Sequence, residues 1–260
     1  LLHGWEDGDL PDDWQQEQPL TRAQARHAPV FVVSKPEFAT TGFTRATTDG
    51  AQFVGVTDLD ERIARAGALA AQHPGSFTYL YVPELDGIGH RAGWESGAWT
   101  EGLERVDASL RDLVRAAPQA GVLITADHGM IDVPASRHVL LDDGDPRLEG
   151  VTDIAGEPRM LHLYTEPQAA DAVAGVWRAA DAERAWVMTR DEAIAAGVFG
   201  SVRPTVADRI GDVLVAARAR VAYYDNRLDD RSPQRMVGQH GSLTLEESVV
   251  PLLRAGAYAV

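Results

Sequence analysis

Two short apolar runs on either side of a long helical pattern most limit how this 260-residue chain can fold. Residues 77–82 and 121–126 are rich in β-branched and aromatic side chains, which is typical of buried strands. Between them, apolar residues recur at helical spacing over residues 95–116. A strand, a helix and a second strand in this order predict a parallel pair with a right-handed crossover. The sequence therefore predicts an α/β fold.

Further strand and helix signals surround this unit. A buried strand is expected at residues 30–33, a weaker strand at 53–56, and a helix from Asp58 to about residue 72. Beyond residue 130 the pattern is less regular. The elements expected there are a strand at 160–164, helices at 167–180 and 191–196, strands at 212–217 and 221–224 that can pair with each other, and a last strand at 249–253.

Composition limits the kinds of partner and ligand. The net charge is −15, and no basic stripe is visible, so binding to a nucleic-acid duplex is not expected. No apolar stretch reaches the roughly 18 residues that a membrane span needs, so no transmembrane segment is expected. The chain has no cysteine. Any metal ion must therefore be held by nitrogen and oxygen ligands.

Asp86 and His90 follow the predicted strand at 77–82, with glycines between them. The glycines favour a tight turn in which the carboxylate and the imidazole converge. A carboxylate beside an imidazole suits zinc or a similar divalent ion. A solvent-exposed turn with a capping aspartate would give the same pattern.

Asp127 and His128 lie at the end of the predicted strand at 121–126. Adjacent residues of a strand point to opposite sides, so this pair suits two different ions better than one shared ion. Two metal ions roughly 3.5–4 Å apart can clamp the entering and leaving oxygens of a phosphoryl group. The alternative is an aspartate that caps the next element beside a partly exposed histidine.

His240 lies in a loop between Gly238 and Gly241. A single loop histidine is usually a surface residue, but a catalytic zinc usually has three protein ligands. Asp86, His90 and His240 would complete one such set. Asp127 and His128 supply only two ligands for a second ion.

No catalytic residue is predicted within this chain. Thr40-Thr41-Gly42 resembles a nucleophile-bearing turn only superficially. The pair Glu246-Glu247 could support the metal ligands without binding the ion, but it is better interpreted as two acidic residues at the start of a helix. His162 alternates with apolar residues and is interpreted as an ordinary strand histidine.

These motifs resemble those of the alkaline phosphatase superfamily, and specifically its type I phosphodiesterase/nucleotide pyrophosphatase family. The matching segments are Asp86-Gly-Ile-Gly-His90, Thr125-Ala-Asp127-His128-Gly129-Met130 and Gly238-Gln-His240-Gly241-Ser242, followed by Glu247 and Pro251. The resemblance implies a three-layer α/β/α fold with a central, mostly parallel sheet. Residues 1–260 would form an incomplete domain of this kind, with metal-site segments at 77–130 and 236–253 and an insertion or cap-like region at about 135–235.

The resemblance also implies two bound divalent metal ions, expected to be zinc. Asp86, His90 and His240 would hold one ion, and Asp127 and His128 would hold the other. The remaining ligands of the second site in the family are an aspartate and a nucleophilic Thr or Ser, both upstream of the matching region. The chain is therefore expected to be a C-terminal portion of the enzyme.

The expected function is hydrolysis of phosphodiester or pyrophosphate bonds in a small phosphate ester such as a nucleotide. In the complete enzyme, a Thr or Ser hydroxyl would attack phosphorus, and water would then hydrolyse the phosphoenzyme. Two alternatives stay open: a relative that cleaves phosphonates or phosphomonoesters, and a metal-binding module without turnover. The sequence leaves the leaving group, the oligomeric state and the compartment open, with a soluble cytoplasmic protein as the favoured expectation.

Overall fold

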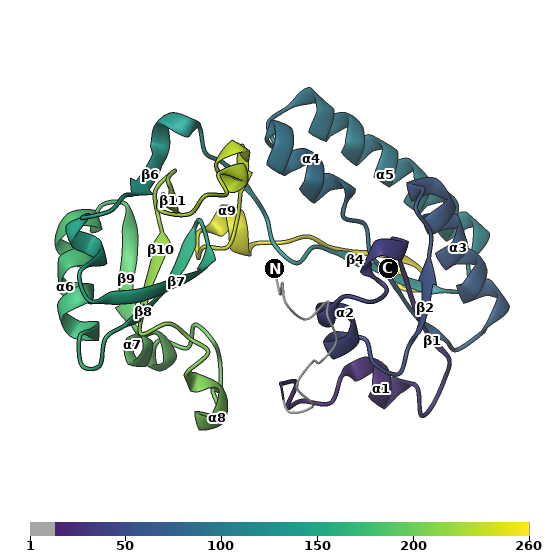
Figure 1. Ribbon diagram of the computed structural model, residues 1–260. Helices are drawn as coiled ribbons and strands as arrows, with labels where there is room; N and C mark the ends of the chain where they lie inside the picture. The colour runs from purple at the N-terminus through teal and green to yellow at the C-terminus, as the bar shows by residue number, and fades with distance from the viewer. Residues whose placement is uncertain (1–13, 260) are drawn as a thin grey trace. The chain divides into compact units, whose positions relative to one another are not determined.

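The computed structural model describes residues 14–259, which form two compact units (Figure 1). The first unit contains the chain up to Leu85, Glu101–Thr125, and the chain from Leu252. The second contains Asp86–Thr100 and Ala126–Pro251. Each unit is thus assembled from segments that are distant in sequence.

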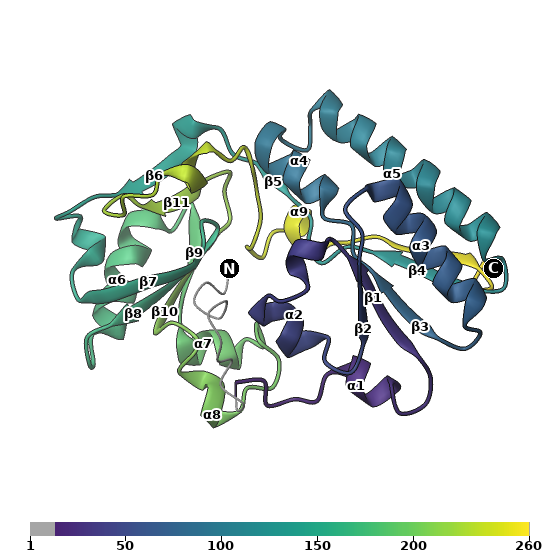
Figure 2. The same ribbon diagram turned by 45° about the vertical axis from the view of Figure 1, so that its right-hand side comes forward.

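The first unit contains a parallel sheet with strand order β2-β1-β3. β1 (Val30–Ser34) is central and pairs in parallel with β2 (Gln52–Gly55) and β3 (Phe77–Leu80). The helices α3 (Leu59–Gln72) and α5 (Gly97–Ala116) lie side by side along one face of these strands (Figure 2). The predicted α/β class with a central parallel sheet is confirmed.

Side-chain caps fix where the helices of the first unit begin. The Asp58 carboxylate accepts hydrogen bonds from the backbone N–H groups of Asp60 and Glu61, at 2.9 and 3.0 Å, and so caps α3 as expected. The Thr41 hydroxyl accepts from the backbone N–H of Thr44 at the start of α2 (Gly42–Thr47). Thr41 therefore has a capping role. The unit also contains α1 (Leu20–Gln24) and a 3₁₀ turn, η1 (Pro36–Phe38).

The expected parallel pairing of the strands around α5 is wrong. β4 (Gly121–Thr125) forms its ladder with β13 (Leu252–Gly256), in antiparallel orientation, and β3 forms its ladder with β1. Both β3 and β4 still contribute apolar residues to the cluster under α5, which is what the strand–helix–strand pattern encodes. The partner strand of β4 comes from the end of the chain, and the local pattern does not specify it.

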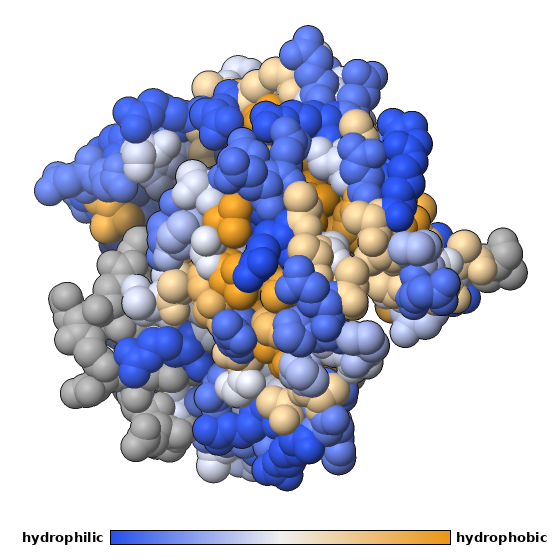
Figure 3. Space-filling model, turned by 90° about the vertical axis from the view of Figure 1, so that its right-hand side faces the viewer, coloured by the Kyte–Doolittle hydropathy of each residue, from blue (hydrophilic) through white to orange (hydrophobic). Residues whose placement is uncertain are grey.

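The strands β3, β4 and β13 also carry apolar side chains that remain exposed. They are Phe77, Tyr79, Leu123, Leu252 and Leu253. Hydrophobic residues are visible among hydrophilic ones on the face of the molecule drawn in Figure 3. Along β3, exposed residues alternate with residues that are partly buried, as the two-residue period of a strand requires.

The second unit is built around an antiparallel sheet with strand order β7-β8-β10-β9. Its strands are β7 (Val151–Glu157), β8 (Met160–Thr165), β9 (Ala185–Thr189) and β10 (Val213–Ala217). α6 (Ala170–Asp181) packs on one face through Trp177, which is fully buried. α7 (Arg190–Ala195) belongs to a second cluster with the alternate residues of β10. β10 is therefore buried on both faces, which explains its unbroken apolar run.

The expected pairing of residues 212–217 with 221–224 is wrong. β10 pairs with β8 and β9, whereas β11 (Ala222–Asp225) pairs in parallel with β6 (His138–Leu141). The carbonyl groups at the end of β10 and in the connection to β11 accept hydrogen bonds from the Arg159 guanidinium instead of from a hairpin partner.

Short elements complete the second unit. They are α4 (Glu84–Ala92), β5 (Ile131–Asp132), η2 (Ala135–Arg137), η3 (Pro146–Leu148), α8 (Pro204–Ala207), η4 (Ser232–Arg235), β12 (Gly238–Gln239) and α9 (Leu245–Ser248). The first two residues of α4 belong to the first unit. Among residues 14–259, no helix combines the length and the apolar character needed to cross a bilayer.

Candidate metal centre

Asp86 and His90 lie on a helix, and the expected tight turn at this position is wrong. In α4, residues four apart lie on one face, so the two side chains meet. His90 Nε2 is 3.2 Å from Asp86 Oδ1. The convergence of carboxylate and imidazole is therefore present, but helical spacing produces it.

His240 joins this pair from a distant part of the sequence. It directly follows β12, which pairs with β5. His240 Nε2 is 3.9 Å from Asp86 Oδ1. Asp86, His90 and His240 each offer one ligand atom, and these atoms all lie within 4.8 Å of one another. This spacing suits a single ion held by three ligands.

A backbone carbonyl fixes the orientation of the His90 ring. His90 Nδ1 lies 2.8 Å from the carbonyl oxygen of Gly238, so we assign the proton to Nδ1 as the donor. This leaves the lone pair on Nε2, the nitrogen that faces Asp86. A ring nitrogen held in this way is the usual arrangement behind a metal-binding histidine.

Asp127 and His128 lie beside this group. The His128 ring stacks on His240 with a centroid distance of 3.7 Å and an interplanar angle of 17°, and His128 Nε2 is 4.0 Å from Asp86 Oδ1. Asp127 Oδ1 is 3.8 Å from His128 Nε2, and the Asp127 side chain is 70% exposed. The two side chains do not diverge as expected. The strand ends at Thr125, so strand alternation no longer applies to them.

Burial and charge make the group receptive to a cation. Within the described part of the chain, the buried Oδ1 atom of Asp86 has no hydrogen-bond partner. Burial by itself would raise the pKa of Asp86, but the contact with His90 and the nearby imidazoles lower it overall. Burial, together with His128 and His90, lowers the pKa of His240 to about 4. His240 is therefore neutral at pH 7, which is the form that binds metal. These donors fit a divalent cation.

Close packing holds the three motif segments against one another. A Cβ atom added to Gly89 would lie 2.4 Å from Met130 Sδ, and one added to Gly238 would lie 2.3 Å from the same sulfur. Val237 N also donates to His90 O at 2.8 Å. Glycine is thus required at two positions where segments approach closely.

Glu246 and Glu247 lie in the first turn of α9, as predicted, but the two side chains differ in exposure. Glu246 is exposed, but Glu247 is only 2% exposed and forms an ion pair with the buried Arg159. One local signal was available. Thr244 lies three residues before Glu247, as in a capping box, and its hydroxyl donates to the Glu247 carboxylate.

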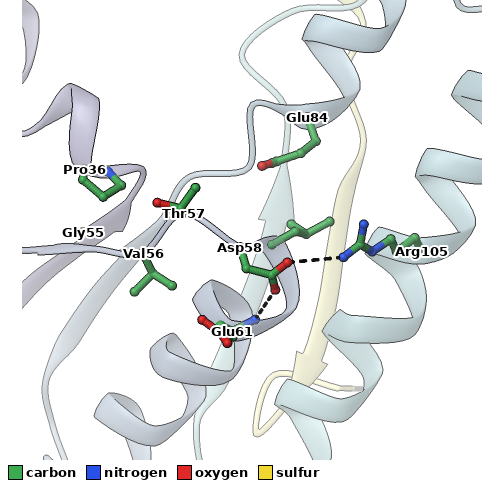
Figure 4. Close-up of a pocket in the computed structure, with 9 residues that line it drawn as sticks. Pro36, Gly55, Val56, Thr57, Asp58, Glu61, Glu84 and Arg105 are labelled. Atoms are coloured by element: carbon green, nitrogen blue, oxygen red, sulfur yellow. Dashed lines mark hydrogen bonds and ion pairs between the residues drawn. The ribbon is translucent and has the colours of Figure 1, made fainter.

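A pocket of about 720 Å³ lies in the first unit, at the carboxyl ends of β1 and β2 (Figure 4). It is lined by Pro36, Gly55, Val56, Thr57, Asp58, Leu59, Glu61, Glu84 and Arg105. Asp58 and Arg105 face each other across it in Figure 4, with Arg105 Nη2 3.7 Å from Asp58 Oδ2. None of the five predicted metal ligands lines this pocket.

Comparison with known proteins identifies the family. The sequence profile described as type I phosphodiesterase / nucleotide pyrophosphatase matches residues 5–243. The chain belongs to this family. The predicted family resemblance is therefore confirmed, whereas no curated protein sequence matches this phosphodiesterase-family chain.

Solved structures with the same fold include members of two kinds of hydrolase. Murine ectonucleotide pyrophosphatase / phosphodiesterase 5, as an inactive variant in complex with AMP, is 17% identical with a TM-score of 0.66, over 91% of this chain and 62% of that one. The human protein of the same name is 17% identical with a TM-score of 0.69, over 94% and 64%. Phosphonoacetate hydrolase from Sinorhizobium meliloti 1021, in complex with phosphonoformate, is 16% identical with a TM-score of 0.62, over 90% and 67%.

These likenesses concern the fold. The phosphodiesterase-family chain spans 62% of the length of the murine structure.

Proposed function

We propose that this chain supplies most of the metal centre of a hydrolase that cleaves phosphodiester or pyrophosphate bonds in a small phosphate ester. The observation that carries the proposal is the meeting of Asp86 and His90, both on α4, with His240 from a distant segment of the chain. Membership of the phosphodiesterase family supports the class of reaction.

In this proposal Asp86, His90 and His240 hold one divalent ion, and Asp127 and His128 contribute to a second. Zinc suits ligands that are imidazoles and carboxylates without thiolate. When bound, such ions act as Lewis acids that stabilise negative charge on a phosphoryl group. The Oδ1 atom of Asp86 supports the first set, because it accepts no hydrogen bond from the described residues although three imidazole nitrogens lie within 4.0 Å of it. The exposure of Asp127 supports its availability to a second ion or to the substrate.

The chain's own residues hold the ligands in place. The Gly238 carbonyl orients the ring of His90, and the stacked rings of His128 and His240 restrict each other's rotation. Ser242, close to His240 in sequence, is buried and donates its hydroxyl proton to the carbonyl of Ala217 at 2.6 Å. We therefore assign Ser242 a structural role.

A nucleotide is the proposed substrate, because AMP is bound in the structure of the murine relative. A phosphonate is the second candidate, because the phosphonoacetate hydrolase that shares the fold binds phosphonoformate. We propose that residues 135–235, which lie within the second unit, form a cap-like region that distinguishes the leaving groups of such substrates.

Metal analysis and phosphodiesterase assays of the full-length protein test this proposal. We expect bound divalent ions and hydrolysis of a chromogenic phosphodiester. His240→Ala and His90→Ala should each lower activity by roughly 100-fold or more. His27→Ala, at an exposed histidine outside the group, is the matched control and should retain activity.

The outcomes separate the candidate functions. Release of phosphate from phosphonoacetate, without cleavage of phosphodiesters, would favour the phosphonate candidate. Bound metal without any turnover would favour a metal-binding module. A full-length protein that contains no divalent ion and binds none on titration would contradict the proposal.

A further inference from the structure

We propose that the buried Arg159–Glu247 ion pair is a positioning device that fixes the loop of His240 and the turn of Asp127 and His128 relative to each other. The inference rests on the proposed function, because it gives these segments their importance. It concerns residues that touch neither ion nor substrate.

The pair is completely buried and completely hydrogen-bonded. The side chains of Arg159 and Glu247 are 0% and 1% exposed. Arg159 Nε and Nη2 donate to the two carboxylate oxygens at 2.8 and 2.6 Å. The other donors reach the carbonyl oxygens of Ala217, Ala219 and Val221, at 3.3, 2.8 and 2.7 Å. All five N–H donors of the guanidinium therefore have an acceptor.

Stability alone does not account for such a pair. The desolvation of two buried charges cancels much of their attraction, and apolar side chains of similar volume often stabilise a protein as well. A fully satisfied buried network does restrict the surrounding backbone to one arrangement. We therefore infer the role of the ion pair from the backbone segments to which it is hydrogen-bonded.

The Glu247 side chain holds the loop that carries His240. Glu247 Oε1 accepts a hydrogen bond from the backbone N–H of Ser242 at 3.0 Å, and Oε2 accepts from the Thr244 hydroxyl. Ser242 also donates to Ala217 O, the same carbonyl that Arg159 Nη2 contacts. The loop from His240 to Thr244 is thus tied to the end of β10 through the ion pair.

The Glu247 backbone holds the other ligand-bearing segment. Its carbonyl oxygen accepts a hydrogen bond from the N–H of Gly129, the residue after His128, at 2.7 Å. A Cβ atom at Gly129 would lie 2.0 Å from the carbonyl oxygen of Glu246, so the two segments approach as closely as glycine permits. One residue therefore contacts both segments, with its side chain on one and its main chain on the other.

The helix that carries Glu247 cannot provide this rigidity by itself. α9 has four residues, fewer than an isolated helix needs to be stable. Metal ligands must keep their positions to within roughly 0.5 Å to retain affinity. The stacking of His240 on His128 depends on both segments being held, and Glu247 joins them in addition to the pairing of β5 with β12.

Glu247→Gln in the full-length protein tests the proposal, because it keeps the size of the side chain and removes its charge. Asp181→Asn is the matched control. Asp181 is also fully buried and paired with Arg147 at 3.0 Å, but it accepts no hydrogen bond from either ligand-bearing segment. Two properties are measured: the affinity for Co²⁺, and hydrogen–deuterium exchange of the backbone amides at residues 127–130 and 240–244.

We expect Glu247→Gln to bind Co²⁺ about 10-fold more weakly and its amides in both segments to exchange about 10-fold faster. Asp181→Asn should leave both properties as in the wild type. If Glu247→Gln behaves like Asp181→Asn in both measurements, the positioning role is refuted. If the wild type binds no Co²⁺, the proposed function fails, but the exchange comparison still decides the positioning role.

If Glu247→Gln does not fold, Thr244→Val tests the positioning role of Glu247 instead. It removes one hydrogen bond to Glu247 and keeps the shape of the side chain. Exchange of the Ser242 amide and the dissociation constant for Co²⁺ should both rise about 3-fold. Unchanged values of both would overturn the inference.

Discussion

Each compact unit buries an arginine that is paired with a glutamate, but the two pairs differ in how many of their polar atoms are satisfied. In the second unit, every donor of Arg159 has an acceptor, and both oxygens of Glu247 accept additional bonds. In the first unit, Arg62 donates to Glu84 and to the carbonyls of Val56 and Thr57. Among the described residues, Arg62 Nε and Glu84 Oε2 have no hydrogen-bond partner.

The difference follows from where each pair lies. Glu84 is 22% exposed and lines the pocket at the carboxyl ends of β1 and β2, so water can reach part of its side chain, although Oε2 itself is buried. Glu247 is enclosed by the loops that carry His128 and His240. In an ion pair beside a pocket, some polar atoms can remain without a hydrogen-bond partner. In an ion pair enclosed between two segments, every polar atom needs a partner, and these hydrogen bonds fix both segments.

The largest effect is expected for Glu247→Ala. It leaves the charge of Arg159 buried without a counter-charge, and it leaves the N–H of Ser242 and the hydroxyl of Thr244 without an acceptor. Loss of one partner of such a pair costs about 3–5 kcal/mol of unfolding free energy. Urea unfolding of the full-length protein measures this loss. A change below about 1 kcal/mol, the value of an ordinary hydrogen bond, would show that the pair is not special.

A slightly smaller effect is expected for Gly238→Ala, which tests the close packing of the ligand segments separately from the ion pair. The added Cβ would lie 2.3 Å from Met130 Sδ and 2.5 Å from the carbonyl oxygen of Gly89. Overpacking of this kind costs roughly 3 kcal/mol at the upper end of its range. Gly175→Ala is the control, because its Cβ position in α6 has no described atom within 4 Å beyond its chain neighbours and the nearby backbone of the helix. It should be neutral or slightly stabilising. Equal unfolding free energies for the two variants would contradict the packing argument.

Glu84→Gln should have a smaller effect than any change that breaks the Arg159 pair. Arg62 keeps its two carbonyl acceptors, and the exposed part of residue 84 remains in contact with solvent. We expect a loss of about 1.5 kcal/mol in urea unfolding, the value for one hydrogen bond to a charged group. A loss as large as that of Glu247→Ala would remove the distinction between the two pairs.

Local sequence signals predicted the elements of the first unit well. The strand at 30–33 and the helix after Asp58 match β1 and α3, because an unbroken apolar run and an N-cap are properties of neighbouring residues. The partner of β4 is the distant segment 252–256, and the partner of β11 is the distant segment 138–141; local patterns specify neither. Strand existence was therefore predictable, and strand pairing was not.

In the candidate site, too, some features were predictable from the sequence and others were not. The meeting of Asp86, His90 and His240 followed from ligand chemistry and the number of ligands that zinc requires. The helix that carries the first two was missed, because Gly89 was interpreted as a turn residue. A helical glycine costs about 1 kcal/mol relative to alanine, and here Met130 occupies the space that a side chain would need. Sequence alone does not show that packing.

The smallest expected effect is on the pH dependence of the unfolding free energy, which should differ between Glu247 and an exposed glutamate. Burial by itself would raise the pKa of Glu247, but the hydrogen bonds from Arg159 and Thr244 lower it overall. A carboxyl group whose pKa is lower in the folded state stabilises the protein fully above its unfolded-state value, near 4.3, and loses this contribution as the pH falls through the folded-state value. The difference in unfolding free energy between the wild type and Glu247→Gln should thus stay constant from pH 8 to about pH 5, then shrink at lower pH.

Glu61→Gln, at an exposed residue of α3, is the control and should show only a small difference in unfolding free energy from the wild type at every pH. If the Glu247→Gln difference already shrinks between pH 8 and pH 6, the carboxylate is not held ionised by Arg159, and the pair is no better satisfied than that of Arg62.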